Sequence, residues 1–503
     1  MAVTPGGRSK AQPSQGQEGS RLSVSELVDS IGFGFAQLRA LALAAGGVLF
    51  CSGLGVVIGN VMVLSVAADF GLSRNQRACL PTCTLTGLMV GTAVSGYFGD
   101  SLGRRHPVVW CFAGSAVFGF LCSAMPSFLG LLLCRGAHGV SMGFGAAPAC
   151  AMLSEITPER WRITMRTMAQ GMFPLGSLLA VGLAATSDAS YEHLDWRRLF
   201  VMVSIPPAVL WFLALCFLPE SPVFLACVGD DTRAAEGFKS MKRLSFSEAA
   251  DLSYMPFGTS KSSALRLPLP TLWHQLGTVF APQFRRATLG SMFACFCVNL
   301  VSYGDGYAAP MVLTKTSDLL PAYQYIAKFT IAVAWTAAIG FLAQVLSRKT
   351  MIVMGLAISS AVCFAFIFGA SQPVPRHFLA SVFFQIGANG IVVGVSMCFV
   401  VLYQLAVEIY PTTASSTGGA VVMGSGRLAA MCVPFLYENL KRLTGHWTAF
   451  YYVLGALAAV ATVVVMCMQT AQAHRPGELD ALDASGRSFG SVSAGKCALG
   501  PGV

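Results

Sequence analysis

The stretch GYFGDSLGRRH at residues 96–106 joins two long apolar segments, residues 78–99 and 107–124. Each segment is long enough to cross the ~30 Å hydrocarbon core of a bilayer as a helix. A weaker copy, GFLAQVLSRKT at residues 340–350, joins the apolar segments 324–346 and 351–370. A short basic loop between two membrane helices therefore recurs in both halves of the chain, which predicts an internally repeated membrane protein.

The composition is that of an integral membrane protein. Of the 503 residues, 54% are hydrophobic and only 11% are charged, whereas a soluble domain carries about 25% charged residues. Twelve apolar segments reach spanning length, which predicts an all-α polytopic membrane protein with twelve transmembrane helices. They cover residues 40–66, 78–99, 107–124, 128–153, 165–187, 199–217, 287–312, 324–346, 351–370, 378–407, 415–436 and 447–470.

Polar stretches divide these helices into two sets of six. A polar insertion at residues 218–285 separates them and is expected to be a cytoplasmic connector. Residues 1–39 read as a cytoplasmic tail with one short amphipathic helix, because Ser23 and Glu26 have capping-box spacing. The predicted domains are this tail, a six-helix bundle over 40–217, the connector, a six-helix bundle over 286–470 and a cytoplasmic tail over 471–503.

The net charge is +10, and many of the basic residues gather in loops on one side of the predicted membrane. Arginines follow helices 2, 4 and 8, and the connector after helix 6 is also basic. By the positive-inside rule this side and both termini are cytoplasmic. The charge therefore indicates membrane topology rather than nucleic-acid binding, and the predicted location is a multi-pass position in the plasma membrane or an organelle membrane.

At these loops the chain resembles the major facilitator superfamily. The residues of GDSLGRR match its signature loop G-x-x-x-D-x-x-G-R-R, and CRGAHG around Arg135 and His138 resembles its helix 4 signature. Glu155-x-x-Pro158 and Glu408-x-x-Pro411 recur, one in each half. The resemblance implies two six-helix bundles and a cytoplasmic gate that controls alternating access. The implied gate residues are Gly96, Asp100, Gly103, Arg104, Arg105, Glu155, Arg162 and Glu408.

Other stretches resemble one branch of that superfamily. IGFGFAQLR, NVMVLSVAADFGLS and VSYGDGYAAP are similar to segments of the synaptic-vesicle-glycoprotein-like, niacin, and organic anion and cation transporters, with Asn60 in place of an acid. Arg427 and Pro434 match a helix 11 pattern in which arginine is typical of anion carriers and aspartate of cation carriers. The resemblance therefore implies an anionic substrate, and a guanidinium pairs well with a carboxylate.

Ionisable side chains inside membrane helices are functional candidates by default. Arg427 is expected to bind the substrate or to pair with Asp305, which is itself a candidate for proton coupling. Gly304 and Gly306 predict local unwinding around Asp305. His138 has two open interpretations, a protonation site and a structural hydrogen bond, and Arg135 is expected to be structural. The predicted substrate site comprises Arg427, Asp305, Tyr303, Gln385, Asn389, Tyr403, Gln170 and Asn60, and the proton-coupling candidates are His138, Asp305 and Arg135.

Three functions remain open. The first is transport of a small organic anion, of the monocarboxylate or nicotinate type, with or without proton coupling. The second is facilitative hexose transport, because LPESP and Gln170 are shared with sugar porters. The third is a non-transporting receptor or trafficking protein on the same fold. Neither a P-loop nor a constellation of nucleophile and base or metal ligands occurs, so we expect no enzyme activity, cofactor or metal, and a monomer whose partners are its substrate and the bilayer.

Overall fold

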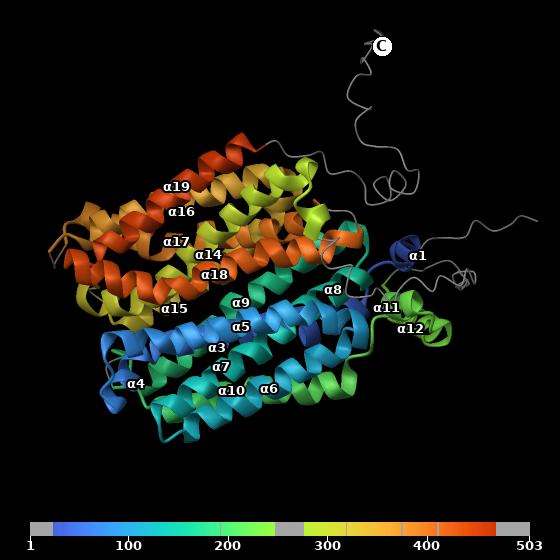
Figure 1. The fold of residues 1–503 in the computed structure, drawn as a ribbon, viewed down its shortest axis with the longest axis horizontal. Helices are drawn as coiled ribbons and strands as arrows, with labels where there is room; N and C mark the ends of the chain where they lie inside the picture. The colour runs from blue at the N-terminus through green and yellow to red at the C-terminus, as the bar shows by residue number, and fades with distance from the viewer. Residues whose placement is uncertain are drawn as a thin grey trace, which may run out of the picture.

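The computed structural model describes residues 24–191, 193–246, 276–317, 319–373, 376–409 and 412–468. Among these residues it is all-helical, and Figure 1 shows the helices as two bundles side by side, the first half of the chain from blue to green and the second from yellow to red. Each long helix is a continuous apolar run that buries one face against its neighbours.

The first bundle contains six membrane-crossing units. The first is α2 (Phe35–Ala40), η1 (Leu41–Ala45) and α3 (Gly46–Val61), followed by the short α4 (Val63–Phe70). The others are α5 (Arg74–Leu102), α6 (Arg105–Ala124), the broken pair α7 (Phe128–Phe144) and α8 (Ala146–Ile156), α9 (Glu159–Ser187) and α10 (Trp196–Phe217).

The second bundle has six long helices. They are α14 (Pro282–Thr316), α15 (Pro321–Val345), α16 (Arg348–Ala370), α17 (Phe378–Glu408), α18 (Thr412–Thr444) and α19 (Thr448–Cys467). By length and composition, ten helices of the described chain qualify as membrane spans. The split α7–α8 and the polar α18 fall short individually, and they occupy the positions of predicted helices 4 and 11.

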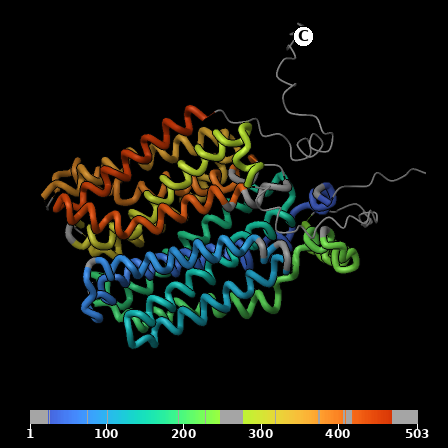
Figure 2. The backbone as a smooth tube through the Cα atoms, in the orientation of Figure 1, coloured from blue at the N-terminus to red at the C-terminus, as the bar shows by residue number. Residues whose placement is uncertain are grey.

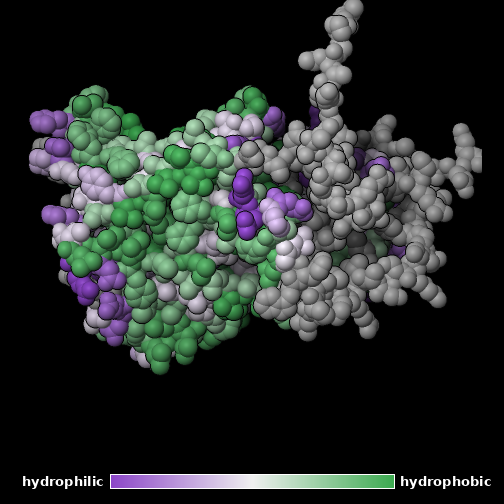
Figure 3. Space-filling view, turned by 45° about the horizontal axis from the view of Figure 1, so that its top comes forward, coloured by the Kyte–Doolittle hydropathy of each residue, from purple (hydrophilic) through white to green (hydrophobic). Residues whose placement is uncertain are grey.

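Three short helices lie together at one end of the molecule, which we call the inner end. They are α1 (Val24–Ile31), α11 (Pro222–Val228) and α12 (Asp231–Arg243), and Figure 2 shows them beside one another beyond the bundles. The opposite end, with the turns between α4 and α5 and between α18 and α19, is the outer end. Figure 3 shows hydrophobic residues over the middle of the molecule and hydrophilic residues gathered at the outer end, as expected for a bilayer-spanning protein.

The two bundles meet along two helix pairs, α5 with α18 and α9 with α15. Small residues bring the helices close together: a Cβ on Gly171 of α9 would lie 2.8 Å from the Thr336 side chain of α15. The central helices α3 and α14 also touch, and Asn60 lies 3.4 Å from the position that a Cβ of Gly306 would take. Candidate substrate residues therefore come from both sides of this interface.

Candidate functional site

Arg427 lies in the middle of α18 and hydrogen-bonds to a phenol, not to a carboxylate. Its Nη1 donates to the hydroxyl of Tyr303 in α14, whose ring centroid lies 5.8 Å from the guanidinium carbon. Its Nε has no hydrogen-bond partner among the described residues, and none of their carboxylates lies within ion-pair distance. The side chain is partly accessible to solvent. The chain as described therefore leaves this guanidinium without a counter-ion.

Asp305 does not supply that counter-ion, contrary to one of the two sequence-based interpretations. Its carboxylate accepts a hydrogen bond from the Nζ of Lys328 in α15 and another, 3.2 Å long, from the hydroxyl of Tyr451 in α19. The Asp305 and Lys328 side chains are only 5% and 7% exposed. The acid and the amine neutralise each other inside the second bundle, so the charge of Asp305 is already compensated.

The predicted unwinding around Asp305 is wrong, because α14 is continuous from Pro282 to Thr316. Gly304 instead allows α19 to approach closely: a Cβ there would lie 3.1 Å from the Phe450 ring. At Gly306 a Cβ would lie 3.4 Å from Asn60 of α3, which is an ordinary contact distance. Gly304 therefore serves helix packing, and the helix supplies its own backbone hydrogen bonds through the membrane.

The surroundings of Arg427 include one amide that we did not place in the site from sequence. Asn299 in α14 packs against Gly426, where a Cβ would lie 2.8 Å from the Asn299 Cγ. Its Nδ2 donates to the Cys295 carbonyl oxygen at 2.8 Å, and its Oδ1 has no partner among the described residues. Tyr403 of α17 also interacts electrostatically with Arg427. A ligand bound at Arg427 would therefore meet an aromatic and amide surface.

Gln385, Asn389 and Gln170 are partly accessible and Asn60 is buried, and none of the four is joined to Arg427 by a described contact. Asn389 donates from Nδ2 to the Gln385 carbonyl oxygen at 2.9 Å and to its Oε1 at 3.1 Å, all on α17. Gln170 lies on α9 beside Gly171, and its Oε1 has no partner among the described residues. Their roles in binding remain predictions.

The two proton-coupling candidates of helix 4 are both deeply buried on α7. The Nη2 of Arg135 donates to the Gly55 carbonyl oxygen at 3.4 Å, and its guanidinium carbon lies 5.5 Å from the Phe200 ring centroid. The Nδ1 of His138 has no partner among the described residues. Arg135 thus has the packing contacts of a structural residue, whereas no described interhelical hydrogen bond holds the His138 imidazole.

At the inner end, Arg104 of the signature loop binds acidic residues from elsewhere in the first half of the chain. Arg104 Nε donates to Glu155 Oε1 at 3.1 Å, and the Arg104 backbone N–H donates to Glu220 Oε1 at 2.8 Å. Ser221, the N-cap of α11, donates to Glu155 Oε2 at 2.5 Å. The cluster therefore ties the ends of α5, α8 and α10 together.

Other predicted gate residues lie differently. Arg162 Nε donates to the Thr157 carbonyl oxygen at 3.1 Å rather than to Glu155, and Arg105 Nη2 donates to the Leu215 carbonyl oxygen at 2.8 Å. The side chains of Asp100 and Glu408 lie outside the described residues. Their part in a gate between the bundles stays a prediction.

The two glycines of the signature loop are expected to respond in opposite ways to alanine. Gly103 has φ = +96°, and a Cβ there would overlap the Glu220 carboxylate. Gly96 is helical and has nothing within 4 Å of its Cβ position. Gly103→Ala should therefore destabilise the cluster by about 1 to 3 kcal/mol, whereas Gly96→Ala should be neutral or slightly stabilising.

Thermal unfolding of the two purified variants in one detergent measures this difference. Equal midpoints for Gly103→Ala and Gly96→Ala would show that the loop adapts and that its glycine spacing has no structural role in the cluster.

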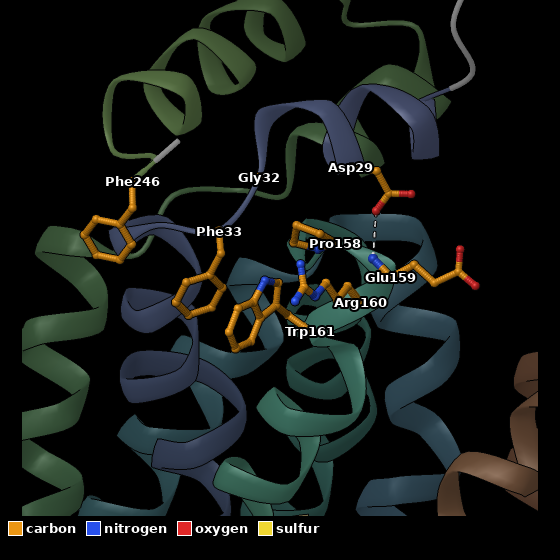
Figure 4. A pocket seen from close by; sticks show the side chains of 8 residues that line it. All are labelled: Asp29, Gly32, Phe33, Pro158, Glu159, Arg160, Trp161 and Phe246. Atoms are coloured by element: carbon orange, nitrogen blue, oxygen red, sulfur yellow. Dashed lines mark hydrogen bonds between the residues drawn. The ribbon is translucent and has the colours of Figure 1, made fainter. Parts of the chain in front are cut away.

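A large cavity lies at the inner end, away from Arg427. It is an open pocket of about 980 Å³, lined by the end of α1 and the loop after it, by the start of α9, and by Phe246, which follows α12. Figure 4 shows the Phe33 ring facing Trp161, 5.0 Å between centroids, and the Asp29 carboxylate accepting the Glu159 backbone N–H at 2.7 Å. These contacts attach α1 to the first bundle.

Sequence reasoning missed four charged residues that the structure pairs: Lys328, Glu220, Arg77 and Glu438. The detectable signal was a charge within an apolar segment for Lys328 and the LPESP stretch for Glu220. Arg77 and Glu438 stand just outside the predicted helices, where single charges are common, so no local pattern marked them.

Comparison with known proteins agrees with this architecture. The chain is 24% identical to a synaptic vesicle 2-related protein of Bos taurus, covering 95% of this chain and 86% of the relative. It is 31% identical over 176 residues to solute carrier family 22 member 6-A of Xenopus laevis, covering 35% of this chain and 30% of the relative.

The fold is also found in a solved structure. The proton:xylose symporter XylE, bound to 6-bromo-6-deoxy-D-glucose, matches with a TM-score of 0.63 at 20% identity, covering 92% of this chain and all of that chain. The sequence model of one family, described as sugar (and other) transporter, matches residues 40–475. The protein is therefore a transporter of the major facilitator superfamily and belongs to its sugar (and other) transporter family.

Proposed function

We propose that this transporter moves a small organic anion, a monocarboxylate of the nicotinate type, across the membrane by alternating access between its two bundles. One observation carries the proposal: Arg427 is a guanidinium at mid-membrane with no carboxylate among the described residues to neutralise it. Such a charge costs about 2.5 to 3.5 kcal/mol on insertion scales. A bound substrate anion would offset that cost and gain a charge-assisted hydrogen bond.

The arrangement around Arg427 supports this choice. Because Asp305 is paired with Lys328, it does not neutralise Arg427, whose charge has no counter-ion among the described residues. Tyr303 packs against an apolar cluster that contains residues of both bundles, among them Val56 and Ala430, so the guanidinium partner lies at the bundle interface. A substrate carboxylate at this interface would contact the first bundle as well as the second bundle, which carries Arg427. The similarity to synaptic vesicle 2-related proteins favours an organelle membrane.

Facilitative hexose transport is the second candidate. The fold shared with a xylose symporter favours it, as do the amide oxygens of Asn299, Asn389 and Gln170, which have no partner in the described part of the chain and could accept sugar hydroxyls. The guanidinium of Arg427 argues against it, since a neutral sugar would leave the charge uncompensated.

Uptake into proteoliposomes discriminates between the candidates. We expect labelled nicotinate or another monocarboxylate to accumulate, and glucose and organic cations to be excluded. Running the panel at acidic and neutral outside pH, with and without a proton ionophore, tests proton coupling. Hexose uptake without carboxylate uptake would overturn the proposal, and the absence of all uptake would favour a non-transporting role.

A further inference from the structure

A buried ion pair joins the two bundles near the outer end. Arg77 in the first turn of α5 donates from Nη2 to Glu438 Oε1 at 2.6 Å, and Glu438 belongs to the last two turns of α18. The two side chains are 20% and 5% exposed. The hydroxyl of Tyr307 in α14 donates to the same oxygen at 3.1 Å. One carboxylate therefore holds together three helices from both bundles.

Further contacts close the same end. The Ala322 backbone N–H of α15 donates to the Ala189 carbonyl oxygen at 3.2 Å, and the rings of Tyr191 and Tyr325 lie 6.3 Å apart. These contacts are backbone or apolar. Glu438 is different, because separating the bundles would break the charge-assisted hydrogen bond that its carboxylate accepts from Arg77. The ion pair thus favours the state in which the outer ends stay together.

The geometry also connects this ion pair to Arg427. Tyr303 and Tyr307 are four residues apart on α14 and lie on one face of that helix. Tyr303 binds Arg427 and Tyr307 binds Glu438, and both of these partners are on α18. Two tyrosine contacts thus line the same α14–α18 interface, one at Arg427 and one at Glu438.

We propose that Arg77, Glu438 and Tyr307 form an outer latch that keeps the substrate path closed at the outer end and that must open for cargo to enter or leave there. The latch rests on the proposed alternating access but not on the identity of the cargo. Its strength sets the proportion of molecules whose outer end is open.

The test measures the separation of the bundles directly, in the full chain and without cargo. Fluorescent non-canonical amino acids at Ala124 and Leu443, which are exposed at the outer ends of α6 and α18, report the distance by energy transfer in nanodiscs. Arg77→Gln and Glu438→Gln are expected to raise the population of the long-distance state by about tenfold or more. Tyr307→Phe, which keeps the ring packed on Tyr437, should raise it less.

Two control variants test whether a change in the distance comes from the ion pair itself. Arg442→Gln removes an exposed arginine one turn beyond Glu438 and should leave the distance unchanged. The exchange Arg77→Glu with Glu438→Arg restores opposite charges and should return most molecules to the short distance.

If either single variant cannot be purified, Tyr307→Phe and the exchange variant still decide the question. An unchanged distance distribution in Arg77→Gln or Tyr307→Phe, or a failure of the exchange to shorten it, would overturn the latch. Because no cargo is used, either outcome is independent of the anion proposal.

Discussion

Replacing Arg427 with lysine or alanine is expected to reduce uptake of the carboxylate identified in the proteoliposome panel by about 100-fold or more. The substrate would lose a charge-assisted, bidentate partner worth about 3 kcal/mol, which corresponds to roughly two orders of magnitude in affinity. Lysine keeps the charge but not the planar pair of donors, so it should not substitute. Initial rates over a range of substrate concentrations separate a change in affinity from a change in turnover.

Matched controls distinguish substrate binding from a structural role of Arg427. Arg286→Ala removes an exposed arginine at the inner end of the second bundle and should leave uptake unchanged. Tyr303→Phe removes the described hydrogen-bond partner while keeping the ring, and it should weaken uptake less than Arg427→Ala. Wild-type uptake by Arg427→Lys would contradict a specific role for the guanidinium. Loss of folded Arg427→Lys protein would instead indicate that Arg427 stabilises the bundle.

The second large effect is on stability. Asp305→Asn is expected to destabilise the protein by about 3 to 5 kcal/mol, because it leaves the Lys328 ammonium buried without its counter-charge. The double variant Asp305→Leu with Lys328→Leu removes both charges and should recover most of that loss. Thermal unfolding in detergent, checked by size-exclusion chromatography, measures both.

The same double variant tests proton coupling through Asp305. If it is stable and still accumulates substrate with the wild-type pH dependence, the ion pair is structural. If it is stable but no longer responds to the proton gradient, Asp305 takes part in coupling. Wild-type stability of Asp305→Asn would contradict the buried ion pair itself.

Much of the fold could be predicted from local sequence. Apolar length and composition indicated the membrane helices, since a segment must satisfy its own backbone in lipid whatever its neighbours are. The spacing of Gly103 and Arg104 indicated the inner loop, and the structure confirms that α5 ends there at a glycine with positive φ. The continuous α14 was less predictable, because glycine permits both unwinding and close packing, and only the helices beside it decide between them.

The sequence by itself determined a repeated, twelve-helix transporter with one arginine at mid-membrane on helix 11. Only the tertiary structure decided that Asp305 does not pair with this arginine. Asp305 and Lys328 lie on different helices, as do Arg77 and Glu438, and each pair is neutral once formed. The physical reason is that hydropathy is a sum over neighbouring residues, whereas an ion pair depends on side chains that meet only after the bundles pack. Pairing therefore leaves no mark in any local window, and it is the pairing of Asp305 with Lys328 that leaves Arg427 without a carboxylate partner among the described residues.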